Sequence, residues 1–186
     1  MQASQFRVRA RVTSRGFTMA ELMAVVAIVG ILSMLAVYST RKYIGASKGA
    51  EAIDMIANIK TAQEAYKQET FGYLDVSSGD LTAYYPANPT PGRSKMNFAG
   101  GTGTLTNNWQ LLGVQTAGPV TFVYACTAGS TGAPTALGSD ITVSNWPTTS
   151  NSPWYVVKAR ADFSGGGVYT VFASSSFTGD VFSANN

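Results

Sequence analysis

Glu21 is a carboxylate at the head of an apolar segment. The run Leu22–Val37 follows it directly, and no other charged side chain occurs between Phe17 and Tyr38. Placing a charge within a membrane-length helix is costly, although less so near the bilayer surface. If the chain were cut after Gly16, Phe17 would gain a cationic α-amino group. The amine of one copy and the carboxylate of another could then form an ion pair, which is strong in an apolar environment.

The segment that positions Glu21 has the features of a membrane helix. Phe17–Tyr38 contains 22 residues, which as an α-helix would be roughly 33 Å long and able to cross a bilayer core. Four arginines and no acidic residue precede it, and this excess predicts that the N-terminus stays in the cytoplasm. The simpler alternative is that Glu21 lies at the headgroup level of an ordinary signal anchor.

The order Arg15-Gly16-Phe17-Thr18-Met19-Ala20-Glu21, followed by the apolar run, resembles the class III signal of type IV pilins and pilin-like proteins. This resemblance implies that prepilin peptidase cuts between Gly16 and Phe17 and that the new N-terminus at Phe17 is methylated. It also implies that Glu21 pairs with Phe17 of a neighbouring subunit during assembly. Many pilins carry a proline at the position of Tyr38, and its absence here leaves open whether the helix bends at that point.

The same features divide the chain into four segments. We expect a cleaved basic leader at 1–16, a transmembrane and assembly helix at 17–38, and an amphipathic continuation of that helix at 39–70. A loop-rich region and an antiparallel β-sheet head domain fill 71–186. The fold class implied by the resemblance is α+β and pilin-like: a long N-terminal α-helix, membrane-spanning in its lower half, packed on a small antiparallel β-sheet.

The continuation of the helix is predicted from its periodicity. One stripe has apolar or large side chains at spacings of three or four, which predicts packing on a sheet. Its members are Ala52, Met55, Ile56, Ile59, Gln63 and Tyr66. Gly45 and Gly49 each weaken the helix by about 1 kcal/mol relative to alanine and mark a candidate bend. Gly72 is the candidate C-terminal cap.

Strand patterns dominate the last third of the chain. Val120–Cys126 is rich in β-branched and aromatic residues, and Val181–Phe182 is a candidate last strand. The strongest hairpin candidate joins Trp154–Phe163 to Val168–Ser174 through a glycine-rich turn at 164–167.

Alternation within the first strand of that hairpin predicts how its faces are used. Lys158, Arg160 and Asp162 alternate with small or apolar residues. This pattern is typical of an antiparallel sheet with one face against a helix and one in water.

Two stretches have no clear periodicity. Leu74–Gly118 and Gly129–Pro153 are rich in glycine, serine, threonine and proline, and we expect loops there. Tyr84, Tyr85 and Trp109 are expected to anchor the first of these to the domain.

The net charge of +3 comes from the leader. Without residues 1–16, the chain has 9 basic and 10 acidic side chains. The basic isoelectric point is therefore no argument for nucleic-acid binding, and nucleic acid stays an open partner.

The sequence offers no recognisable catalytic constellation. It has one cysteine, Cys126, which rules out an intramolecular disulfide. It has no histidine, which rules out catalytic triads with a histidine base and zinc sites with histidine ligands. We expect no enzyme activity, no cofactor and no metal, and we expect Cys126 to be a buried strand residue. A calcium site involving Asp140, Asp162 and Asp180 stays open, although their spacing is not that of a known loop.

The resemblance to type IV pilins implies that the chain is a structural subunit of a type IV pilus-like filament. Its precursor would lie in the inner membrane, and the processed subunit would enter an extracellular pilus or a periplasm-spanning filament for attachment, motility, DNA uptake or secretion. Its partners would be prepilin peptidase/N-methyltransferase, other pilin subunits and the inner-membrane assembly machinery. A minor pilin or a type II secretion pseudopilin is the alternative within this class. A membrane-anchored or secreted periplasmic β-domain with an ordinary Sec signal is the alternative of another class, and it leaves Gly16, Phe17 and Glu21 unexplained.

Overall fold

The structure is a computed structural model that describes residues 16–87, 94–100, 103–163 and 165–185. The chain divides into two compact units, one that ends at Tyr43 and one that begins at Ile44. The predicted leader lies outside the described residues, apart from Gly16.

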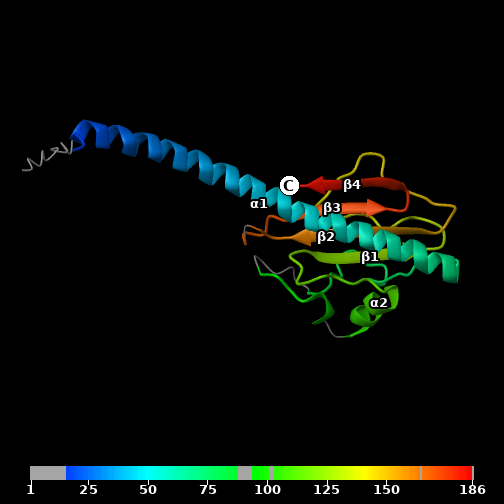
Figure 1. The fold of residues 1–186 in the computed structure, drawn as a ribbon. Helices are drawn as coiled ribbons and strands as arrows, with labels where there is room; N and C mark the ends of the chain where they lie inside the picture. Colours follow the sequence, from blue (N-terminus) through cyan, green and yellow to red (C-terminus); the bar gives the residue numbers. More distant parts are fainter. Residues whose placement is uncertain (1–15, 88–93, 101–102, 164, 186) are drawn as a thin grey trace, which may run out of the picture. The chain divides into compact units, whose positions relative to one another are not determined.

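The first element, α1, is a single helix from Met19 to Thr70 (Figure 1). Its N-terminal part exposes every side chain from Met19 to Thr40, and that stretch is long and apolar enough to cross a membrane. The helix continues without a break through Gly45 and Gly49, so the weak helix propensity of glycine does not interrupt it.

The second unit contains a four-stranded antiparallel sheet in the order β1-β2-β3-β4. The strands are Val123–Gly129, Trp154–Ala161, Thr170–Ser175 and Thr178–Ala184. The predicted hairpin is confirmed, because β2 pairs with β3 over six residue pairs. The last strand is longer than the two residues that the sequence suggested. Together with α1, the sheet confirms the predicted α+β fold class.

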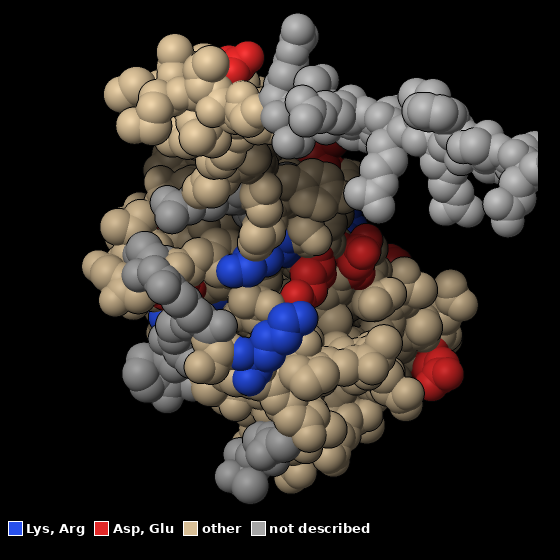
Figure 2. All heavy atoms as spheres, turned by 60° about the vertical axis from the view of Figure 1, so that its left-hand side comes forward, with Lys and Arg blue, Asp and Glu red and all other residues tan. Residues whose placement is uncertain are grey.

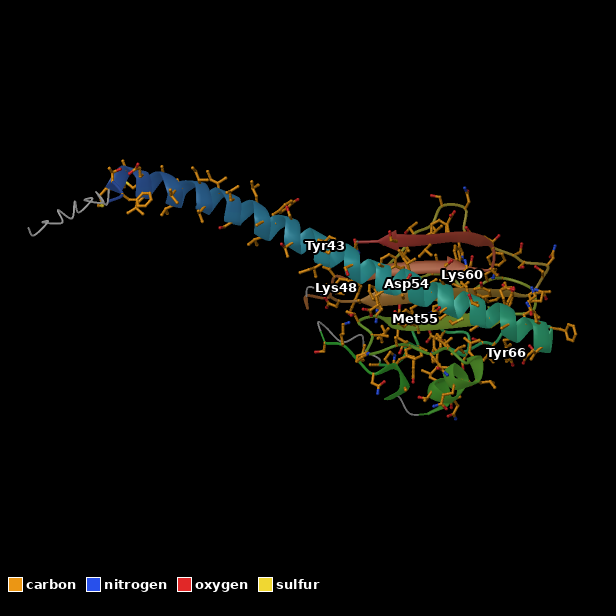
Figure 3. The ribbon with its side chains drawn as sticks, in the orientation of Figure 1. Tyr43, Lys48, Asp54, Met55, Lys60 and Tyr66 are labelled. Atoms are coloured by element: carbon orange, nitrogen blue, oxygen red, sulfur yellow. The ribbon has the colours of Figure 1, made fainter. Side chains whose placement is uncertain are left out.

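The C-terminal half of α1 lies across one face of the sheet (Figure 1). Met55 lies on the packed side of α1 and Asp54 on its exposed side (Figure 3). The predicted stripe is confirmed, since its first five members are buried and Tyr66 is partly buried against the same core. Full burial of one aliphatic side chain stabilises a fold by about 1.5–3 kcal/mol, so this stripe contributes much of the attachment of α1 to the sheet.

The opposite face of the sheet differs from the prediction. Lys158 is 2% exposed and Asp162 is 7% exposed, so this face is not in water. A second apolar cluster covers it, in which residues from two loops pack on β2 and β3. The loop residues buried there are Leu81, Tyr84, Leu137 and Ile141. The alternation of residue types in β2 is real, but its polar side chains face loop atoms instead of solvent.

The region predicted to be irregular contains a further helix, α2, at Thr104–Leu112. Gly113 caps its C-terminus: its left-handed φ of 75° suits glycine, and its N–H donates to the carbonyl of Gln110. A 3-10 turn, η1, lies at Phe98–Gly100. The predicted anchors Tyr84, Tyr85 and Trp109 are all buried.

The C-terminus of α1 lies where it was expected, but the capping residue is different. Phe71 takes the left-handed conformation with φ 63°, and its N–H donates to the carbonyl of Lys67 at 2.8 Å. Gly72, the predicted cap, follows it. A phenylalanine in this conformation carries a steric cost that glycine avoids.

Candidate functional site

Phe17 and Glu21 lie together at the N-terminal end of α1. Phe17 precedes the helix and is 81% exposed. Glu21 lies in the first helical turn and is also exposed. It has the only charged side chain in the stretch from Met19 to Thr40.

The carboxylate of Glu21 closes a capping box with Thr18. Its Oε2 accepts hydrogen bonds from the Thr18 backbone N–H at 2.8 Å and from the Thr18 hydroxyl at 2.9 Å. The Glu21 N–H in turn donates to Thr18 Oγ1 at 3.2 Å. These bonds satisfy backbone donors that a helix start leaves without partners, and the negative charge suits the positive end of the helix dipole. Thr18 is a site residue that the sequence reasoning missed, although a threonine three residues before a glutamate is the signature of this motif.

Gly16 is not required by the conformation of the described chain. A Cβ atom built on it meets no other atom within 4 Å, and its backbone is outside the left-handed region that favours glycine. Nothing in the described chain therefore requires glycine at this position.

The candidate calcium residues do not come together in the structure. Asp140 forms an ion pair with Lys158 at 2.6 Å, and Asp162 accepts the N–H groups of Gly165 and Gly167 at 2.7 and 3.0 Å. Among the residues that the structure describes, no group of three or more histidine, cysteine or acidic side chains is placed to hold a metal ion.

Cys126 is a buried strand residue, as predicted. It lies in β1, is fully buried and accepts a hydrogen bond on Sγ from Gln63 Nε2 at 3.1 Å. Burial raises the pKa of its thiol to about 12. A thiol that stays protonated is a poor nucleophile and a poor metal ligand.

Charged side chains of both signs gather in a mixed cluster on the face of the molecule that Figure 2 shows. Most of the described residues on that face are neither basic nor acidic. An alternation of signs does not favour a polyanion such as nucleic acid, which a continuous basic patch would attract.

Comparisons with known proteins match parts of the chain. Residues 11–37 match the family described as the prokaryotic N-terminal methylation motif. The chain is 38% identical over 78 residues to the type IV major pilin protein PilA of Myxococcus xanthus (strain DK1622). This match covers 42% of the chain and 34% of that protein, so the chain spans about a third of the relative's length. No solved structure matches the chain. The chain therefore carries an N-terminal methylation motif and is similar over 78 residues to a type IV major pilin.

Proposed function

We propose that this pilin-like chain is the structural subunit of a type IV pilus-like filament that assembles through the N-terminal part of α1. The observation that carries the proposal is the exposed apolar surface from Met19 to Thr40, headed by one carboxylate inside a matched methylation motif. An apolar helix exposed on all sides is stable in lipid or against other apolar helices, but not in water.

The precursor is held in the inner membrane with its N-terminus in the cytoplasm. Prepilin peptidase cuts after Gly16, and the new α-amino group at Phe17 is methylated. The open space around Gly16 supports this assignment, because a peptidase must reach the backbone there. The inner-membrane machinery then transfers α1 from lipid into a bundle of like helices, so that its apolar surface stays out of water.

Glu21 selects the stagger between subunits in this proposal. The amine of an incoming Phe17 binds the carboxylate of a neighbouring copy, and a charge pair between helices is strong because little water is present. In the isolated chain, the Thr18 bonds converge on Oε2 of Glu21. The cap thus fixes the position of the carboxylate before a partner arrives. The loop-covered head is displayed on the filament for attachment, motility, DNA uptake or secretion.

Intact-mass spectrometry on filaments sheared from the native cells tests the proposal. We expect a dominant species that runs from Phe17 to Asn186 and is one methyl group heavier than the bare chain. A chain found uncut in membranes, or trimmed beyond residue 38 in the periplasm, would contradict it and favour an anchored or secreted β-domain. Immunogold labelling along the filament length, compared with labelling of the tip alone, separates a major subunit from a minor one.

A further inference from the structure

Three basic residues follow the apolar stretch of α1, on the side that the proposed topology carries across the membrane. They are Arg41, Lys42 and Lys48, and no acidic residue occurs between Glu21 and Glu51. We call these three residues the post-span basic group. Short translocated segments beside a span usually carry few basic residues, because the excess of lysine and arginine lies on the cytoplasmic side. Membrane topology therefore does not explain this group.

The position of the group along the chain keeps it near a bilayer surface. The candidate span ends at Thr40, and α1 continues as a helix through Lys48, eight residues later. Eight helical residues rise about 12 Å, and the headgroup layer on each side of the hydrocarbon core is roughly 5–8 Å deep. Whatever the tilt of the helix, covalent continuity therefore keeps Lys48 within about 12 Å of the hydrocarbon edge.

Lys48 also contacts the turn between β2 and β3. Its ammonium nitrogen lies 4.5 Å from the ring centre of Phe163, and both residues belong to the unit that begins at Ile44. A cation over an aromatic ring is attracted by the negative face of the ring. This contact holds the turn at the end of the head where its part of α1 begins, which the label of Lys48 marks in Figure 3.

The turn presents an apolar side chain on an ordered backbone. Asp162 accepts the N–H groups of Gly165 and Gly167, which holds residues 165–168 of the turn in place. Val168 is 62% exposed. An ordered turn loses little conformational freedom when it contacts a surface, and an exposed valine gains free energy when that surface removes it from water.

The charges at this end of the head favour an anionic surface. The acidic residue nearest to Lys48 along α1 is Glu51, and its carboxylate is already engaged. It accepts hydrogen bonds from the N–H and hydroxyl of Thr121 and lies 3.7 Å from the Lys95 ammonium. Asp162, the acidic residue of the turn, is 7% exposed. The post-span basic group is therefore left to act on a partner, and each basic residue near a surface of anionic lipids adds to binding.

We propose that, in the precursor, this end of the head rests on the anionic headgroups of the outer leaflet of the inner membrane. The post-span basic group binds lipid phosphates, and Val168 enters the headgroup layer. The inference rests on the proposed function, since it concerns the membrane-held precursor. The contact keeps the head in one orientation on the membrane until the subunit leaves the bilayer.

Fluorescence quenching on the full-length chain in lipid nanodiscs tests this proposal. The discs contain phosphatidylglycerol as the anionic lipid and a second lipid with a nitroxide on its headgroup. In a Cys126→Ser background, Val168→Cys carries the fluorophore. Phe177→Cys is the matched control, because Phe177 is also an exposed apolar residue and lies in the turn at the other end of β3.

Because β3 has six residues and is about 20 Å long, we expect at least about threefold stronger quenching at position 168 than at position 177. Both substituted side chains are exposed, so neither change removes a buried contact of the head. Equal quenching at the two positions would overturn the proposal.

The lipid charge provides a second test, which distinguishes contact from mere tethering. Phosphatidylcholine in place of phosphatidylglycerol should lower the quenching at position 168. The double variant Arg41→Gln, Lys42→Gln should lower it in anionic discs, because each cation near an anionic surface favours contact by about fivefold. Quenching that is the same in both lipids would overturn the assignment to anionic headgroups.

Ser33→Cys separates this inference from the proposed function on which it rests. Ser33 lies within the apolar stretch of α1 and is exposed. A nitroxide on the lipid acyl chains should quench a fluorophore there, and its failure to do so would overturn both the membrane-held precursor and this inference. Quenching at position 33 together with equal quenching at positions 168 and 177 would overturn this inference alone.

Discussion

At the scale of single residues, Glu21 has one function in the isolated chain and a second one in the proposed filament. It caps its own helix through Thr18. In a filament it would also attract a cationic amine. The two functions depend on different properties of the side chain, because a cap needs an acceptor oxygen while an ion pair needs the negative charge. Substitutions can therefore separate them.

Glu21→Gln keeps an acceptor for the capping box and removes the charge. We expect normal cleavage but about tenfold fewer surface filaments, since an ion pair in an apolar environment is lost. Thr18→Ala does the opposite: it removes the helix cap and keeps the charge of Glu21. Loss of the cap should cost about 1 kcal/mol of helix stability. We expect Thr18→Ala to assemble nearly as well as the unaltered protein. Quantification of sheared filaments measures both, and abundant filaments in Glu21→Gln would remove the charge pair from the mechanism.

Gly16→Val tests the assigned cleavage position. A valine side chain would obstruct a peptidase at the backbone, although nothing in the described chain is near it. We expect at least about a tenfold loss of the processed form, measured by intact mass in membrane fractions. Gly30→Ala is the control, because a Cβ there also meets no atom within 4 Å. It should be processed normally, and equal processing of Gly16→Val would show that the cut lies elsewhere.

At the scale of secondary-structure elements, the C-terminus of α1 carries backbone strain. Phe71 is in the left-handed conformation and is 87% exposed, so its ring contributes little packing. Phe71→Gly should relieve the strain, whereas Phe71→Ala removes the ring and keeps the conformation. We expect the glycine variant to be more stable than the alanine variant by about 1 kcal/mol, measured by chemical denaturation. Equal stabilities would mean that the backbone conformation at this position costs nothing.

The elements differ in how well their sequence predicts them. The stripe on α1 and the β2–β3 hairpin were predictable because their periodicity is local to each segment. α2 was missed because it has nine residues and is rich in threonine and asparagine, which are weak helix formers. Burial of Thr106, Trp109 and Leu112 stabilises it instead. That burial depends on contacts with distant segments, which local patterns do not reveal.

The environment of Lys158 was mispredicted for a related reason. Alternation in a strand shows which residues share a face, but not what covers that face. Here the cover is supplied by Leu137 and Asp140, about twenty residues earlier in the chain. The candidate assembly site was easier to predict, because Gly16, Phe17 and Glu21 belong to one short motif. Their roles stay predictions until the variants above are measured.

At the scale of the whole molecule, the head is stabilised without a disulfide. Its sheet has an apolar cluster on each face, one with α1 and one with the loops. Lys60 of α1 (Figure 3) also donates to Ser174 at 3.1 Å and to the Thr178 carbonyl at 2.9 Å, which joins the helix to β3 and β4. Because no disulfide joins α1 or the loops to the sheet, a reagent can reach the buried side chains of the sheet whenever α1 or a loop moves away from it.

Cys126 can therefore report on the opening of the head. Its thiol is fully buried in β1, and burial raises its pKa to about 12, so it should be both inaccessible and protonated at pH 8. We expect a thiol-alkylating reagent to label the native protein at least about a hundredfold more slowly than the urea-unfolded protein, measured by intact mass over time. A Cys126→Ser protein with Ser47→Cys, which places a thiol at an exposed helix position, is the control and should react rapidly in both states. Rapid labelling of native Cys126 would show that β1 opens readily and that packing alone does not keep the sheet closed.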